Sequence, residues 1–168
     1  MTKAFKTVWN VIFTLVVVTV VLTAVLLVGV RLIGLRPFTV LSGSMEPAYH
    51  VGSLIYVKEV DPETVNAGDP ITFVLNADLV VATHRVVRVD KENSHFYTKG
   101  DANAGEDAAP VHFKNLIGKP VFTIPYLGYL ANFLETKQGR IIAVTAIAAL
   151  LVLVFLPDML KPIKKTIK

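Results

Sequence analysis

The feature that most constrains this chain is a run of 24 uncharged residues between Lys6 and Arg31, rich in valine and leucine. As an α-helix it would extend roughly 36 Å, which is enough to cross a bilayer. Trp9 lies near its start, where aromatic rings favour the membrane interface. A cleaved signal peptide is the alternative, but its apolar core is normally about 7–15 residues long, and no Ala-x-Ala site follows here. We therefore predict an uncleaved membrane anchor.

A second uncharged stretch covers 141–156, between Arg140 and Pro157. As a helix it would span about 24 Å, slightly less than a hydrocarbon core, and Arg140 and Lys161 could snorkel to the interfaces. A buried helix of a soluble domain is the alternative, but the stretch has no polar face to meet water. The sequence therefore predicts a second transmembrane helix.

Lysines at the two ends of the chain indicate its orientation: Lys3, Lys6, Lys161, Lys164, Lys165 and Lys168. Because basic flanks stay on the cytoplasmic side of a membrane, both termini are predicted to be cytoplasmic. Four basic residues flank the predicted spans on the opposite side, contrary to this rule: Arg31, Arg36, Lys137 and Arg140. The predicted map is a tail and first transmembrane helix at 1–33, an extracytoplasmic domain at 34–139, a second transmembrane helix at 140–157 and a basic cytoplasmic tail at 158–168. The protein is thus expected to be a multi-pass protein of the cell membrane.

The middle region has the pattern of a β-domain. Short segments rich in β-branched and aromatic residues lie at 54–57, 71–75, 79–89, 95–98 and 119–124. Turn signals such as Asp61-Pro62 and residues 67–70, 76–78 and 99–101 separate them. The predicted fold is mainly β, a small antiparallel barrel or sandwich between two transmembrane helices.

Composition and charge exclude several classes of protein. The chain is 53% hydrophobic and only 18% charged, which excludes a disordered tail. It has no cysteine, which excludes disulfides and thiolate chemistry. Its net charge of +4 comes from the ends, because 34–139 holds 12 of the 13 acidic and 9 of the 17 basic residues. An acidic domain argues against a nucleic-acid partner.

Metal and phosphate sites are not indicated either. The four histidines, His50, His84, His95 and His112, have neither i, i+4 spacing nor an HExxH pattern. No glycine-rich phosphate loop is present, and the acidic segment 99–107 lacks the ligand spacing of a calcium loop. We expect no cofactor and no metal.

The segment 42–47, Ser-Gly-Ser-Met-Glu-Pro, is a candidate nucleophile loop. Gly43 permits a sharp bend that could project a hydroxyl and free backbone N–H groups as oxyanion donors. An ordinary surface loop has the same composition, so the pattern alone leaves both interpretations open. Ser44 lies 11 residues after Ile33, at most roughly 38 Å from the end of the first span. A hydroxyl held there suits a substrate that is itself a membrane segment.

A nucleophilic serine needs a base, and His84 is the candidate on the segment 80–89. In a strand, His84 shares a face with Val80, Ala82 and Val86, whose apolar surroundings favour the neutral imidazole that a general base requires. A purely structural histidine fits the same pattern, and composition alone does not choose His84 over the other three. The acidic loop 99–107 could supply a carboxylate that orients the histidine, or could be a solvated loop.

Four motifs in this order resemble those of the type I signal peptidases. Segment 42–47 resembles the nucleophile box, 51–57 the strand after it, 83–86 (Thr-His-Arg-Val) the base-bearing strand, and 99–101 (Lys-Gly-Asp) the late Gly-Asp box. The resemblance covers about 38–125. At the base position this chain has histidine instead of lysine, as in the endoplasmic-reticulum, archaeal and some Gram-positive members.

The resemblance implies roles for individual residues. Ser44 would be the nucleophile and His84 the general base, with the backbone N–H of Ser44 and the hydroxyl of Ser42 in the oxyanion hole. Asp107 matches the family's orienting position, and Asp101 matches a second acidic position that supports the site. The resemblance leaves open which of the two carboxylates orients His84.

The implied function is a membrane-bound serine endopeptidase that removes signal peptides from secreted preproteins. The implied partners are preprotein signal peptides, membrane lipid and the protein-export translocon. Two alternatives remain: a related peptidase with a narrow substrate set, such as pilin-like or biofilm proteins, and an inactive membrane-tethered module that only binds a partner.

Overall fold

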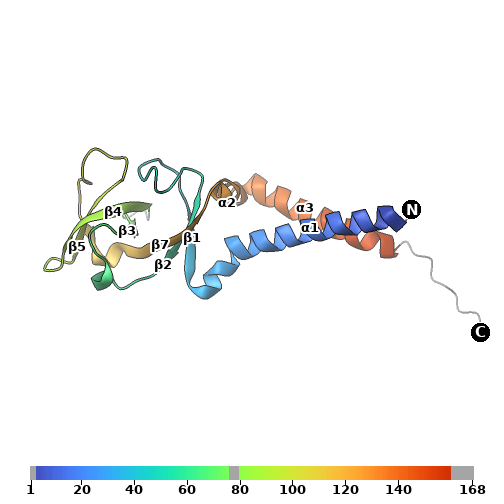
Figure 1. Cartoon of the computed structure of the whole chain (residues 1–168), viewed down its shortest axis with the longest axis horizontal. Helices are drawn as coiled ribbons and strands as arrows, with labels where there is room; N and C mark the ends of the chain where they lie inside the picture. Colours follow the sequence, from blue (N-terminus) through green and yellow to red (C-terminus); the bar gives the residue numbers. More distant parts are fainter. Residues whose placement is uncertain (1–2, 76–79, 160–168) are drawn as a thin grey trace, which may run out of the picture. The chain divides into compact units, whose positions relative to one another are not determined.

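The computed structural model describes residues 3–75 and 80–159 (Figure 1). The predicted turn at 76–78 and the first residue of the predicted strand 79–89 lie outside these ranges. So does the predicted basic tail from residue 160 onward. The chain divides after Tyr129 into two compact units.

The first unit begins with a long apolar helix, α1 (Lys3–Leu27). Its segment Thr7–Leu27 has 21 residues and a mean hydropathy of 2.7, and none of it is buried within the protein. By length and composition this segment qualifies as a membrane span, as predicted. A short 3₁₀ helix, η1 (Gly29–Ile33), follows and ends at Gly34, whose φ of 79° is left-handed.

Seven strands form the rest of this unit: β1 (Leu35–Thr39), β2 (Leu54–Lys58), β3 (Pro70–Val74), β4 (Val81–Asp90), β5 (His95–Lys99), β6 (Val111–His112) and β7 (Leu116–Ile124). Two further 3₁₀ helices are η2 (Pro62–Thr64) and η3 (Phe113–Asn115). The strands lie in the order β1-β2-β7-β3-β4-β5-β6, and every pair is antiparallel. The mainly β prediction is confirmed.

The sheet differs from the prediction at its two ends. β1 and β6 were not predicted, and they are the outermost strands in the order, so the sheet is a half-barrel. β1 contains Pro37, which has no N–H to donate and is tolerated on an edge strand. β6 has only two residues, too few to show a strand period.

The hydrophobic core combines side chains of the sheet with one from η3 and one that follows η2: Val65, Ile71, Phe73, Val86, Phe96, Val111 and Phe113. Phe96 and Phe113 stack with ring centroids 4.4 Å apart. Burial of each large apolar side chain contributes about 1.5–3 kcal/mol. Strand β2 is buried on both faces, and its Tyr56 hydroxyl donates to the Leu26 carbonyl oxygen, which ties the sheet to the end of α1.

The region predicted to form a helix at 140–157 lies within a longer helix, and another helix precedes it. Helix α2 (Leu127–Glu135) is followed by α3 (Lys137–Met159), and the two meet at an angle of 100°. Thr136 caps α3, because its hydroxyl oxygen accepts the N–H of Gly139. The segment Lys137–Leu153 counts as a candidate membrane span only together with α2. The second transmembrane helix therefore stays a prediction.

Gly118 allows β7 to pass close to the end of β2. Its φ is +153°, and a Cβ built there would overlap the carbonyl oxygen of Lys58. Only glycine fits without moving the backbone of one of these two paired strands.

We predict that Gly118→Ala lowers the free energy of unfolding by at least about 2 kcal/mol, because strain and backbone overlap act together. Gly105→Ala is the control, since no atom lies within 4 Å of a Cβ built there. It should change the unfolding free energy by less than about 1 kcal/mol. Denaturant unfolding of the two variants measures both values, and equal stabilities would contradict this account of Gly118.

Candidate active site

The candidate nucleophile lies on a tight loop between β1 and β2. The loop is closed at its base by two backbone hydrogen bonds, from Val40 N to Ser53 O and from Gly52 N to Val40 O. Met45, the residue after Ser44, is 2% exposed and anchors the loop in the protein. Ser44 itself remains partly exposed.

His84 approaches this loop from the centre of the sheet. It lies in β4 opposite Ile71 of β3, and its side chain is 14% exposed. The ring meets Phe73 edge-on, with centroids 6.2 Å apart. His84 Nε2 lies 3.2 Å from Ser44 Oγ, within hydrogen-bond distance. The predicted serine and histidine are therefore adjacent, although 40 residues separate them in the sequence.

Asp107 completes a line of hydrogen bonds. Its Oδ2 lies 2.6 Å from His84 Nδ1, and its side chain is 20% exposed. With the Nδ1 proton donated to this carboxylate, Nε2 is left as the acceptor for the Ser44 hydroxyl. Thr98 Oγ1 also donates to Asp107 Oδ2, at 2.6 Å.

Asp101 binds Arg85 and not His84. Both of its carboxylate oxygens accept hydrogen bonds from Arg85, from Nε at 2.8 Å and from Nη2 at 2.6 Å. This guanidinium holds the pKa of Asp101 below its ordinary value of 3.8, while partial burial opposes the shift. Arg85 Nη1 also donates to the carbonyl oxygen of Gly68. Of the two candidate carboxylates, the structure places Asp107 on His84 and Asp101 on Arg85.

The loop that carries both aspartates is bound directly to the nucleophile loop. Ala102 N donates to the carbonyl oxygen of Ser44 at 2.9 Å. At Gly100 a Cβ would lie 2.6 Å from the same oxygen. Glycine therefore allows the two backbones to approach, and the residue after Asp101 holds Ser44 by its main chain.

Ser42 also lies beside the nucleophile, with its Oγ 3.3 Å from Ser44 Oγ. Its side chain is exposed, so the hydroxyl is able to rotate toward a substrate oxygen.

The other three histidines lie elsewhere. His50 contacts Glu46, and His95 meets His112 edge-on with centroids 5.1 Å apart. Within residues 3–75 and 80–159, no group of three histidine, aspartate or glutamate side chains could hold a metal ion.

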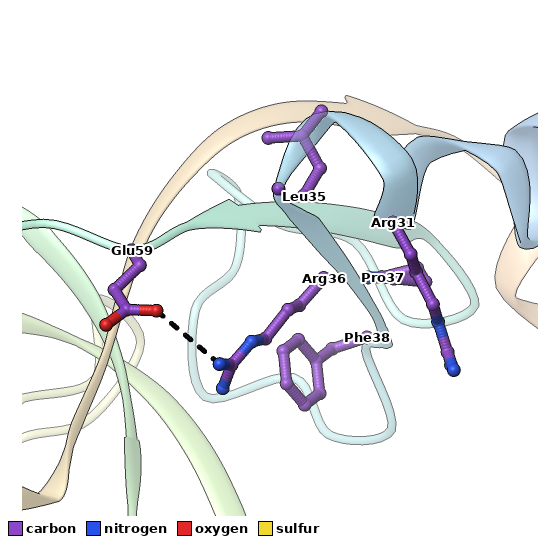
Figure 2. Close-up of a pocket in the computed structure, with 7 residues that line it drawn as sticks. Arg31, Leu35, Arg36, Pro37, Phe38 and Glu59 are labelled. Carbon is purple, nitrogen blue, oxygen red and sulfur yellow. Dashed lines mark hydrogen bonds and ion pairs between the residues drawn. The ribbon is translucent and has the colours of Figure 1, made fainter.

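A separate groove of about 460 Å³ lies near the end of α1 (Figure 2). It is lined by η1, β1 and Glu59, toward which Arg36 points with its guanidinium. Ser44, His84 and Asp107 do not line it, so this groove is distinct from the hydrogen-bonded site.

Sequence reasoning missed three contributors to the site: Gly100, Arg85 and Thr98. Gly100 and Arg85 lie inside the matched motifs, but only the folded backbone reveals what they contact. Thr98 gave a weak signal, because it alternates with the aromatic Phe96 along one strand, and that pattern points it inward.

Comparisons with known proteins find relatives of this chain. No protein-family model matches the chain. Signal peptidase I W of Bacillus subtilis (strain 168) is 42% identical over 112 residues, which are 63% of this chain and 58% of that protein. The putative signal peptidase complex catalytic subunit SEC11B of Homo sapiens is 30% identical over 128 residues, 70% of this chain and 77% of that protein. The human catalytic subunit SEC11C is 33% identical over 99 residues, 53% of this chain and 52% of that protein.

The chain therefore belongs to the type I signal peptidases, in the branch that has histidine at the base position. The resemblance identified from the sequence is confirmed. The matched region spans a little over half the length of the Bacillus protein and of SEC11C.

The Arg85–Asp101 pair leads to a pH-dependent prediction. Because the pKa of Asp101 is lowered in the folded protein, its ionised form contributes stability above about pH 4. This contribution is lost as the pH falls through the lowered pKa. Asp101→Asn should therefore reduce the unfolding free energy at pH 7 by on the order of 1 kcal/mol, since Arg85 is 37% exposed and solvent screens the pair.

Denaturant unfolding between pH 7 and pH 2 measures this difference, which should shrink toward zero at the acid end. Glu106→Gln is the control within the same loop, because no ion pair of Glu106 is found among the described residues. A difference between Asp101→Asn and the unsubstituted protein that persists unchanged at pH 2 would show that the charge of Asp101 is not its source.

Proposed function

We propose that this chain is a membrane-bound serine endopeptidase that cleaves signal peptides from preproteins, with Ser44 as nucleophile and His84 as general base. The observation that carries the proposal is the hydrogen-bonded line from Ser44 Oγ through the His84 ring to Asp107 Oδ2. The names of the relatives, signal peptidase I W and signal peptidase complex catalytic subunits, support the same activity.

In the first step, His84 Nε2 accepts the proton of the Ser44 hydroxyl while Oγ forms a bond to the scissile carbonyl carbon. The charge that develops on the carbonyl oxygen is stabilised by the N–H of Ser44 and the hydroxyl of Ser42. Asp107 stabilises the imidazolium and keeps the Nδ1 proton on its own side of the ring.

In the second step, the C–N bond breaks and His84 returns its proton to the leaving amine, which becomes the new N-terminus of the mature protein. Water then attacks the Ser44 ester, with His84 again accepting a proton. The signal peptide leaves with a free carboxylate, and Ser44 regains its hydroxyl.

The site is suited to substrates that are themselves membrane segments. The hydrogen bond from Tyr56 to Leu26 joins the end of the apolar helix to β2, the strand that follows the nucleophile loop. Leu41, three residues before Ser44 on the nucleophile loop, is 74% exposed and offers apolar surface to a substrate. An uncleaved signal peptide would reach such a site without leaving the bilayer.

For the membrane arrangement we propose the map with 1–33 and 140–157 as the membrane segments, 34–139 extracytoplasmic and 158–168 cytoplasmic. The bilayer would be the cell membrane, and lipid and the export translocon would be neighbours of the protein. The support is the length and hydropathy of α1 and the excess of lysine at both ends of the chain. The bend between α2 and α3 requires that the second segment enters the membrane at an angle to α2.

We predict that Ser44→Ala and His84→Ala each reduce preprotein cleavage by at least about 10³-fold, because serine without its base is a poor nucleophile. His95→Ala is the control, since this histidine lies on the neighbouring strand outside the site. Cleavage of a preprotein by the full chain in lipid vesicles gives the rates. Undiminished cleavage by Ser44→Ala would reject the mechanism, and no cleavage by the unsubstituted protein would favour a module that only binds.

The membrane map can be tested cleanly because the chain has no cysteine. We expect Glu92→Cys, in the exposed turn between β4 and β5, to react with a membrane-impermeant maleimide on intact cells. Ile167→Cys should react only after the membrane is opened. Labelling of Ile167→Cys from outside would place the C-terminus on the other side and overturn the map.

A further inference from the structure

Thr98 is one of the most deeply buried polar residues of the sheet. It lies in β5, where alternate residues are buried, so that Phe96 and Thr98 point inward. Phe96 packs in the core, whereas Thr98, a residue that is 1% exposed, carries a hydroxyl. A buried hydroxyl needs a hydrogen-bond partner, and the partner here is the Asp107 carboxylate.

Two contacts bind Thr98 to Asp107. Thr98 Oγ1 donates to Asp107 Oδ2 at 2.6 Å, and the Thr98 carbonyl oxygen accepts the N–H of Asp107 at 2.8 Å. The same Oδ2 atom also accepts the hydrogen bond from His84 Nδ1, at 2.6 Å. A single oxygen therefore receives one donor from the strand and one from the histidine.

We propose that Thr98 is a positioning residue whose hydroxyl fixes the Asp107 carboxylate with Oδ2 facing His84, and that it thereby sets the ring orientation that presents Nε2 to Ser44. The proposal deepens the proposed function and, in its effect on cleavage, rests on it. Thr98 touches neither the substrate nor Ser44 Oγ and acts only through Asp107.

The physical argument concerns rotation of the carboxylate. The torsion next to a carboxylate is broad and roughly two-fold, so the side chain does not fix its own plane. The Asp107 side chain is 20% exposed, so water competes with His84 for its oxygens. The hydrogen bond from the buried Thr98 hydroxyl to Oδ2 restricts rotation of the Asp107 carboxylate. A methyl group in its place would put apolar surface against a charged oxygen and favour rotation toward water.

A purely structural role for Thr98 makes a different prediction. If its hydroxyl only satisfies a buried group, its removal lowers stability and leaves the geometry of the site unchanged. Thr72 provides the matched control for this case. It is 0% exposed in β3, and its hydroxyl is hydrogen bonded to that of Thr83 at 2.8 Å, away from Asp107.

The first measurement is the kinetics of preprotein cleavage by the full chain in lipid vesicles. We expect Thr98→Val to reduce kcat about 10–100-fold with little change in KM, because residues that orient a reacting group have effects of this size. Thr98→Ser retains the hydroxyl and should restore kcat to within a few-fold. Thr72→Val should lower the unfolding temperature and keep kcat.

The second measurement does not depend on activity. The Nδ1 proton of His84 should give a protected, low-field resonance in the NMR spectrum of the unsubstituted protein and of Thr98→Ser. In Thr98→Val the resonance should broaden or vanish, because the proton exchanges with water when the carboxylate rotates. The NMR measurement distinguishes failure of the proposed function from failure of the positioning role, since it tests the role of Thr98 even if no preprotein is cleaved.

The proposal is overturned if Thr98→Val keeps both kcat and the resonance, or if Thr72→Val loses them to the same extent. If valine prevents folding, Thr98→Cys takes its place, because a thiol is similar in size and only a weak donor. The expected losses are then the same, and full retention by a folded Thr98→Cys equally overturns the proposal.

Discussion

The site depends on one backbone hydrogen bond, from Ala102 N to the carbonyl oxygen of Ser44. It joins two loops that are far apart in the sequence, and Gly100 permits the approach because a side chain there would meet the same oxygen. Once this contact forms, Ser44 is held at a fixed distance from the loop that contains Asp107. The position of His84 between them then follows from the sheet, since β4 pairs with both β3 and β5.

Successive side chains of β4 point to opposite faces of the sheet, and this gives the two aspartates of the loop different partners. His84 and Arg85 are adjacent in the strand, so their side chains point to opposite faces. Asp107 binds the histidine and Asp101 binds the arginine. Because each carboxylate has its own cationic or donor partner, the two do not compete for His84. Arg85 also donates to the carbonyl oxygen of Gly68, so the guanidinium that binds Asp101 is itself held by the backbone.

Much of the β-domain could be predicted from the sequence, because β2, β3, β4 and β5 each show a run of β-branched or aromatic residues bounded by turn signals. β1 was missed because Pro37 interrupts its pattern, and β6 because two residues show no period. The bend before α3 was missed although Thr136 is a capping residue three positions before Gly139. The predicted span began at residue 140, after the bend, and the segment of α2 was not predicted as a helix.

Less of the candidate site than of the fold could be predicted from the pattern of residues. The pattern of residues proposed Ser44 and His84 but did not choose His84 among four histidines, and the family resemblance made that choice. Between Asp101 and Asp107 the decision depends on which carboxylate faces which side of β4, and only the folded loop determines that. Thr98 acts through a contact nine residues along the chain, so the alternation of β5 indicates that it points inward but not what it contacts.

The most direct test of the account is to identify the atom that becomes acylated during cleavage. A peptide ester that carries a signal-peptide sequence acylates a serine faster than an amide does, so the ester intermediate accumulates and is preserved by acid quenching. Mass spectrometry of the digested protein should find the signal-peptide fragment attached to Ser44, and the adduct should be absent from His84→Ala. An adduct on another residue, or one that persists in Ser44→Ala, would contradict the central claim that Ser44 is the nucleophile.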